Sequence, residues 1–188
     1  YMPPRACASL GRLVAACALL LVLAVPAQAI PPSLRAITPP GGARGTEVTV
    51  TLHGTDLRNA EQVLFREPGI SAGALESDGR TVTTTFAIAE DARLGTHTVR
   101  VRTQEGVTNL WQFSVGALTE IEEAEPNSTA ETPQAIARGT TVNGVVQNED
   151  VDYFAVDLDV GQRLAVEVEG LRLGGPLFDP KLRLFGPR

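Results

Sequence analysis

Short runs in which apolar and polar residues alternate, each bounded by turn residues, constrain this chain more than any other feature of its sequence. In residues 47–54, Val48, Val50 and Leu52 share one face of an extended strand, while threonine and histidine side chains share the other. The alternation recurs at residues 82–88, 98–102 and 111–115, and no stretch with helical periodicity separates these runs. The pattern predicts an all-β antiparallel sandwich over residues 30–117 and argues against alternating strands and helices.

The turns and strands of this first block are similar to those of a known family. Residues 39–42, two prolines followed by two glycines, predict a turn that leads into the first main strand. The order Ile37-Thr38-Pro39, Gly42, Gly45-Thr46 and VTVTLHGTDL, with Gly95 before HTVRV, resembles an IPT/TIG immunoglobulin-like module. The resemblance implies an extracellular spacer or binding platform that carries no catalytic residues.

A second block of short strands follows an acidic segment. Residues 118–133 are rich in glutamate, proline, serine and threonine, which predicts a linker. Apolar residues then alternate in four runs, which predict strands at Thr141–Val146, Tyr153–Leu158, Arg163–Val168 and Lys181–Phe185. The strings EPNS at 125–128, DVDYF at 150–154 and GQ at 161–162 resemble the bacterial pre-peptidase C-terminal (PPC) domain. The resemblance implies a second, incomplete antiparallel sandwich over residues 134–188, which lacks the last strands of the family's domain.

Residues 1–29 have the order of a secretory signal peptide. Arg5 and Arg12 precede the uncharged run at residues 13–25, and Ala27-Gln28-Ala29 supplies a small-residue cleavage site. A membrane-spanning helix needs about 20 apolar residues, so this run is too short to remain as an anchor. A lipoprotein site at Cys17 fits less well, because the longest apolar run follows that cysteine. We therefore predict cleavage after Ala29, a secreted, periplasmic or cell-surface location, and no transmembrane segment in the mature chain.

Composition excludes several classes of function. The chain has 16 Lys+Arg against 22 Asp+Glu, a formal net charge of −6, and Lys181 is its only lysine. A nucleic-acid partner is therefore not expected, because phosphate binding needs a basic stripe. Cys7 and Cys17 both lie in the predicted signal peptide. The mature chain then has neither a disulfide nor a thiolate metal site.

Oxygen-bearing side chains in two segments form the candidate metal site. Glu123, Glu125 and Asn127 alternate in the acidic segment, and Asp150 and Asp152 precede the tyrosine of the second string. Calcium takes about 6–8 oxygen ligands at about 2.3–2.6 Å. In the collagen-binding members that the second block resembles, the linker and this turn bind calcium together. The resemblance implies these five residues as ligands, and Glu149 is the alternative to Asp150. A solvated acidic linker beside an aspartate-rich turn is the competing interpretation.

Four other features of the sequence give little support for a chemical function. Residues 69–73 match the G-x-S-x-G nucleophile elbow, but a turn and a threonine-rich strand follow where the elbow needs a helix. We therefore predict that Ser71 lies in a surface loop and is not a nucleophile. His53 and His97 lack partners at metal-ligand spacing. The acidic residues lack the apolar cleft of a glycosidase, and the sequon at Asn127 would stay unused in a bacterial export context.

These observations predict a non-catalytic pair of spacer or binding modules near the start of a larger secreted or cell-surface protein. The expected partner is a protein, a polysaccharide or another cell-surface ligand, with calcium as the one candidate cofactor. The alternative is a pair of accessory domains in a secreted peptidase whose catalytic domain lies beyond Arg188.

Overall fold

The computed structural model describes residues 30–145, 147, 150–170 and 179–186, and these contain strands and loops without any helix. The predicted all-β class is confirmed. The signal-peptide prediction concerns residues 1–29, which lie outside the described residues. No helix in the described ranges is long and apolar enough to cross a membrane.

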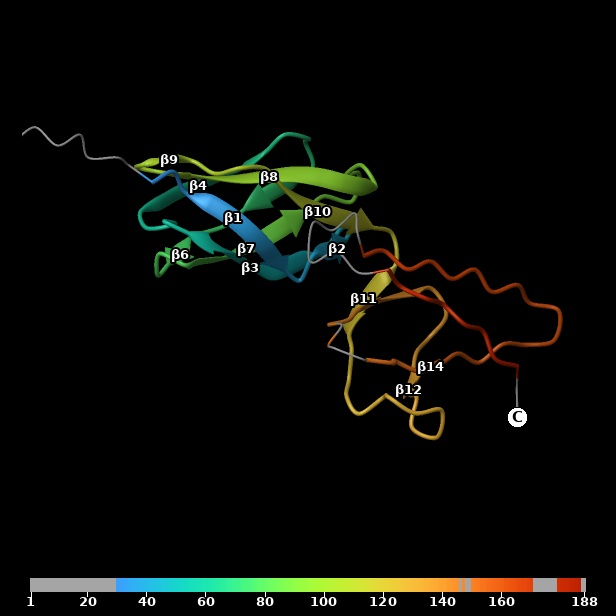
Figure 1. Ribbon diagram of the computed structural model, residues 1–188. Coiled ribbons are helices and arrows are strands. Elements are labelled where there is room, and N and C mark those ends of the chain that lie inside the picture. The colour runs from blue at the N-terminus through green and yellow to red at the C-terminus, as the bar shows by residue number, and fades with distance from the viewer. Residues whose placement is uncertain (1–29, 146, 148–149, 171–178, 187–188) are drawn as a thin grey trace, which may run out of the picture. The chain divides into compact units, whose positions relative to one another are not determined.

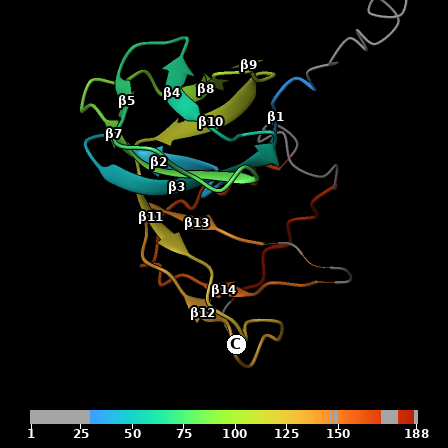
Figure 2. The same ribbon diagram turned by 90° about the vertical axis from the view of Figure 1, so that its left-hand side faces the viewer.

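Two sheets face each other in the first block (Figures 1 and 2). The first sheet is antiparallel and has the order β1(Ser33–Thr38), β3(Glu47–Thr55), β7(Thr81–Ile88), β5(Ile70–Ala72), with β6(Glu76–Ser77) also pairing with β7. The second sheet has the order β2(Gly41–Ala43), β10(Trp111–Gly116), β8(Gly95–Thr103), β4(Ala60–Phe65), with β9(Gly106–Val107) also pairing with β8. β2 is parallel to β10, and the other pairs of this sheet are antiparallel. The strands at residues 47–54, 82–88, 98–102 and 111–115 form as predicted.

The core lies between these two sheets and is built from the inward side of the alternating pattern. Val50, Leu52 and Val82 have no exposed surface. The Phe86 ring packs edge-on between the rings of Phe65 and Phe113, with centroid separations of 5.0 and 5.2 Å. Full burial of an aliphatic or phenyl side chain stabilises a fold by about 1.5–3 kcal/mol. This core therefore holds both sheets, and with them the outer strands β4 and β5, in place.

The predicted turn at residues 39–42 is shorter than expected. Gly41 and Gly42 belong to β2, which runs beside β10. A Cβ atom on Gly41 would lie 2.7 Å from the carbonyl oxygen of Ser114, a distance that real Cβ atoms essentially never show. The two glycines therefore permit the close approach of two strands, and the turn is confined to Pro39 and Pro40.

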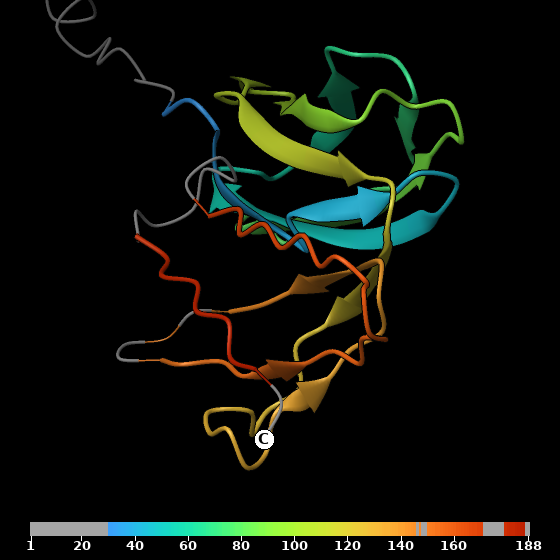
Figure 3. The same cartoon turned by 90° about the vertical axis from the view of Figure 1, so that its right-hand side faces the viewer.

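The second block contains two short parallel ladders (Figures 2 and 3). β11(Thr119–Glu122) pairs with β13(Thr140–Asn143), and β12(Gln134–Ala135) pairs with β14(Phe154–Ala155). The described pairing is thus parallel where antiparallel strands were expected. β11 also occupies the start of the predicted linker at residues 118–133.

Several strand predictions in the second block are wrong in extent. The strand expected at Tyr153–Leu158 is confined to β14, and the described part of the one expected at Thr141–Val146 ends at Asn143. Arg163–Val168 and Lys181–Phe185 have the alternating pattern but no strand in the described structure. A strand needs a hydrogen-bonded neighbour and a covered apolar face. Here the apolar side chains remain exposed, from 38% for Leu164 to 72% for Phe185.

Candidate metal centre

The ends of two strands bring the predicted acidic residues together. Glu123 directly follows β11, Glu125 lies two residues later, and Asp152 lies two residues before β14. Each of these three side chains offers a carboxylate oxygen, and the three oxygens lie within 4.8 Å of one another. We call Glu123, Glu125, Asp152 and the adjoining Asn127 the acidic cluster.

Hydrogen bonds hold the acidic cluster in this arrangement. The side-chain amide of Asn127 donates to Glu123 Oε1 at 2.9 Å, and its backbone N–H donates to Glu125 Oε2 at 2.9 Å. The N–H of Val145 donates to Glu123 Oε2 at 2.9 Å. The N–H of Tyr153 donates to the carbonyl oxygen of Asn127 at 2.9 Å, which joins the loop after β11 to the turn before β14. The carboxylates are therefore positioned by the backbone of both segments.

Two oxygens of the cluster are buried without a hydrogen-bond partner. Asn127 has no exposed surface, and neither its Oδ1 atom nor Oδ1 of Asp152 accepts a hydrogen bond in the described structure. Leaving a buried acceptor unsatisfied costs about 1–3 kcal/mol. A bound cation would satisfy both oxygens at once. The competing interpretation, a solvated acidic linker, does not explain why these two oxygens are buried without a partner.

The charges of the cluster also favour a cation. The pKa of Asp152 is raised from 3.8 to about 6, first by burial and then by the negative charges of Glu123 and Asp150. A hydrogen bond from the protonated carboxyl of Asp152 to Glu123 and the charge of Glu125 act in the same direction. The fold thus places carboxylates together against their mutual repulsion. A divalent cation would remove the cost of that repulsion.

The donor set suits a hard cation. The carboxylates and the Asn127 amide offer oxygen only, and Ca²⁺ and Mg²⁺ prefer oxygen ligands, whereas Zn²⁺ favours nitrogen and sulfur. Calcium also accepts irregular geometry and carboxylates that bind through one or two oxygens. The acidic cluster therefore fits Ca²⁺ better than Mg²⁺, which demands a near-ideal octahedron.

The remaining predicted ligands are placed differently. Asp150 Oδ2 accepts a hydrogen bond from the N–H of Gln147 at 3.1 Å, and Asp150 is not among the carboxylates that gather within 4.8 Å. It acts on the cluster through its charge. Glu149, the alternative ligand, lies outside the described residues.

One supporting residue gave no signal in the sequence. Gln134, at the start of β12, accepts a hydrogen bond from the N–H of Ala124 at 2.9 Å and donates one to the carbonyl oxygen of Glu122 at 3.1 Å. It thereby holds the backbone on both sides of Glu123. A single glutamine ten or more residues away has no spacing pattern that could have identified it.

The structure also bears on the motifs outside the cluster. Ser71 lies on β5 opposite Ala87 of β7, so residues 70–72 form a strand where a loop was predicted, and no helix follows them as a nucleophile elbow requires. His97 is fully buried, with Nε2 2.6 Å from the carbonyl oxygen of Arg93. The sequon asparagine, Asn127, is buried, so a glycan could not be attached to it in the folded state.

Comparisons with known proteins add little. No protein-family model matches the sequence, and no curated protein matches it. Among solved structures, the chain is similar to SGBP-B of the mixed-linkage glucan utilization locus of Bacteroides ovatus, in complex with a mixed-linkage heptasaccharide, with a TM-score of 0.32 and 14% identity. The match covers 52% of this chain and 23% of that protein's chain. A likeness this distant carries no argument about what the present chain binds.

Proposed function

We propose that residues 30–188 form a non-catalytic extracellular pair of modules, IPT/TIG-like and then PPC-like, whose second module is stabilised by a bound calcium ion. The observation that carries the proposal is the acidic cluster, in which three carboxylates converge beside buried oxygens of Asn127 and Asp152 that have no partner. The absence of a helix after Ser71 argues against a nucleophile elbow in the first module.

Calcium would act here as a clamp between two segments of chain. Glu123 and Glu125 come from the loop after β11, and Asp152 comes from the turn before β14. An ion bound to both segments would hold them together in a way that the two short ladders cannot. Because the unfolded chain lacks the assembled site, ion binding becomes folding free energy.

Thermal unfolding with and without calcium tests this proposal. For one site, the stabilisation is about 2.7 kcal/mol at a free calcium concentration a hundredfold above Kd. Extracellular calcium modules have Kd values of about 10⁻⁴–10⁻³ M, so millimolar calcium should raise the melting temperature and a chelator should reverse the rise. Isothermal titration calorimetry on the whole chain measures the affinity directly.

Matched variants separate the cluster from general charge effects. Asp152→Asn and Glu125→Gln keep side-chain size while they remove a ligand charge, so each should weaken calcium binding at least tenfold. Asp91→Asn removes an exposed carboxylate from the first block and should leave the affinity unchanged. Equal titration curves for the wild type and both ligand variants would contradict the proposal and leave the cluster as a solvated acidic surface.

A further inference from the structure

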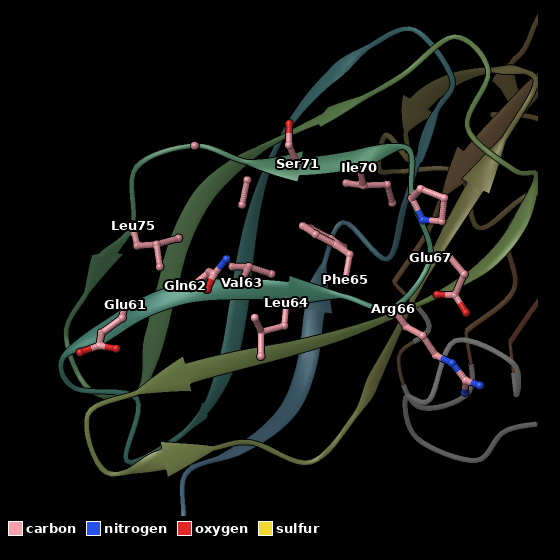
Figure 4. Close-up of a pocket in the computed structure, with 13 residues that line it drawn as sticks. Glu61, Gln62, Val63, Leu64, Phe65, Arg66, Glu67, Ile70, Ser71 and Leu75 are labelled. Atoms are coloured by element: carbon pink, nitrogen blue, oxygen red, sulfur yellow. The ribbon is translucent and has the colours of Figure 1, made fainter.

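The two sheets of the first block leave a groove open along one side. β4 is the outer strand of one sheet and β5 is the outer strand of the other. A groove of about 620 Å³ lies between them and is lined by both strands and the residues that follow them. Figure 4 shows Phe65 of β4 and Ile70 of β5 reaching into the space between the two strands. The groove therefore has a strand edge on each side, and apolar side chains such as those of Phe65 and Ile70 line it together with polar ones such as those of Glu61 and Glu67.

The edge of β4 presents backbone groups that pair with no other strand in the described structure. β4 pairs with β8, and Arg66 donates its N–H to the carbonyl oxygen of Thr98. Backbone groups of successive residues point alternately to the two sides of a strand. The backbone N–H and C=O groups of Leu64 and Arg66 thus point toward β8. Those of Val63 and Phe65 point toward the groove.

Three arginines lie on the outer face beside this edge, and two carboxylates, those of Glu61 and Glu67, also line the groove. Arg66 is exposed and points away from the groove (Figure 4), as does Leu64. Arg100 lies opposite Leu64 on β8 and is exposed, so its side chain stands on the same face. Arg102 stands there too, although its charge is partly balanced by Glu61 at 3.4 Å. The inner face at Val63 and Phe65 is apolar.

We propose that the edge of β4 is a docking site for an extended peptide of a partner protein in which aliphatic and acidic residues alternate. Addition of a strand to a sheet edge satisfies the free backbone groups, and side chains at alternate positions supply the specificity. Aliphatic side chains of the peptide face the groove beside Val63 and Phe65. Acidic side chains lie on the outer surface beside Arg66, and Arg100 stands on the same face one strand further in, on β8. β4 provides the longer edge, because its pairing spans residues 60–65 and β5 spans only 70–72.

The test uses the whole chain and a synthetic peptide in which valine and glutamate alternate. Fluorescence polarisation of the labelled peptide measures affinity, and amide hydrogen exchange measures protection of Val63 and Phe65. We expect saturable binding and slower exchange at these two amides. A peptide of the same length with proline in place of a central residue should bind more weakly, because proline removes a backbone donor.

Charge-reversed variants separate strand addition from unspecific adsorption. The double variant Arg66→Glu, Arg100→Glu should bind the valine–glutamate peptide about tenfold more weakly and should gain affinity for a valine–lysine peptide, because Arg66 adjoins the added strand and Arg100 lies one strand further in on the same face. Arg35→Glu is the control, since Arg35 is exposed on β1 at the far edge of the other sheet.

Three results would overturn the proposal. The first is the absence of binding, and the second is equal binding of the proline peptide or an unchanged preference in the double variant. The third is protection of the same amides by concentration-dependent self-association without peptide, which would assign the edge to a second copy of this chain.

Discussion

Replacing Phe86 by leucine tests whether the aromatic contacts of the first block hold its two sheets together. Phe86 is fully buried, and its ring meets those of Phe65 and Phe113 at interplanar angles of 79° and 77°. Each such edge-on pair contributes about 0.5–1.5 kcal/mol beyond the area that it buries. Loss of both pairs and partial loss of ring volume should lower the free energy of unfolding by about 3 kcal/mol.

Urea unfolding followed by tryptophan fluorescence measures this loss. Trp111 is the only tryptophan of the chain and packs against the core, so its signal reports the first block. With a slope of about 1 kcal/mol per molar urea, the midpoint should fall by about 3 M. Phe185→Leu is the matched control, because that ring is 72% exposed, and its midpoint should stay within experimental error. A loss below about 1 kcal/mol for Phe86→Leu would refute the reasoning.

Three other perturbations have defined outcomes. Gly42→Ala should destabilise the first block by about 1–3 kcal/mol in the same urea assay, because the new Cβ would lie 2.6 Å from Ile88 Cδ1, and overpacking a core has a cost of this size. The pKa of Asp152 is raised from 3.8 to about 6, so its contribution to the stability of the calcium-free fold is full below about pH 3.8 and is lost as pH rises through about 6. After solvent screening this loss of stability is about 1 kcal/mol. Hydrogen exchange of the β14 amides from about pH 4.5 to 7 measures the loss, and the Asp152→Asn variant should not show it. Finally, if residues 1–29 are a signal peptide, N-terminal sequencing of the exported protein should begin at Ile30, whereas a lipidated Cys17 would contradict the predicted site.

The strands of the first block could be predicted from sequence because each carries a one-sided pattern that the opposite sheet covers. Val82, Phe86 and Ile88 alternate with threonine and alanine in β7, and all three are buried. The edge strands could not be predicted in the same way. Gly41 and Gly42 have the composition of a turn. They form a strand because they pair with β10, whose backbone lies too close to Gly41 for a side chain there. Such a strand depends on a neighbour that is distant in the sequence, and local patterns do not contain that information.

The candidate site could be located from sequence because its ligands are clustered in two short segments, but its geometry depends on contacts between them. The hydrogen bond between Tyr153 N–H and the Asn127 carbonyl oxygen, and the hydrogen bonds of Gln134, join residues that are ten or more positions apart. Spacing alone also could not show that Asp150 caps a backbone amide while Asp152 faces the carboxylates.

The described part of the second block contributes nothing to the buried apolar core, whose members all lie between Leu34 and Val115. Its alternating segments have the composition of core strands, but side chains such as Val166 and Leu184 are 44% and 68% exposed. A ladder as short as the one between β12 and β14 cannot offset the conformational entropy that the chain loses when it becomes ordered. What the second block does possess is a set of converging carboxylate oxygens whose repulsion is relieved by protonation of Asp152 at low pH and would be relieved by a bound cation at neutral pH. Its stability should therefore follow calcium concentration, whereas the stability of the first block should follow the packing around Phe86.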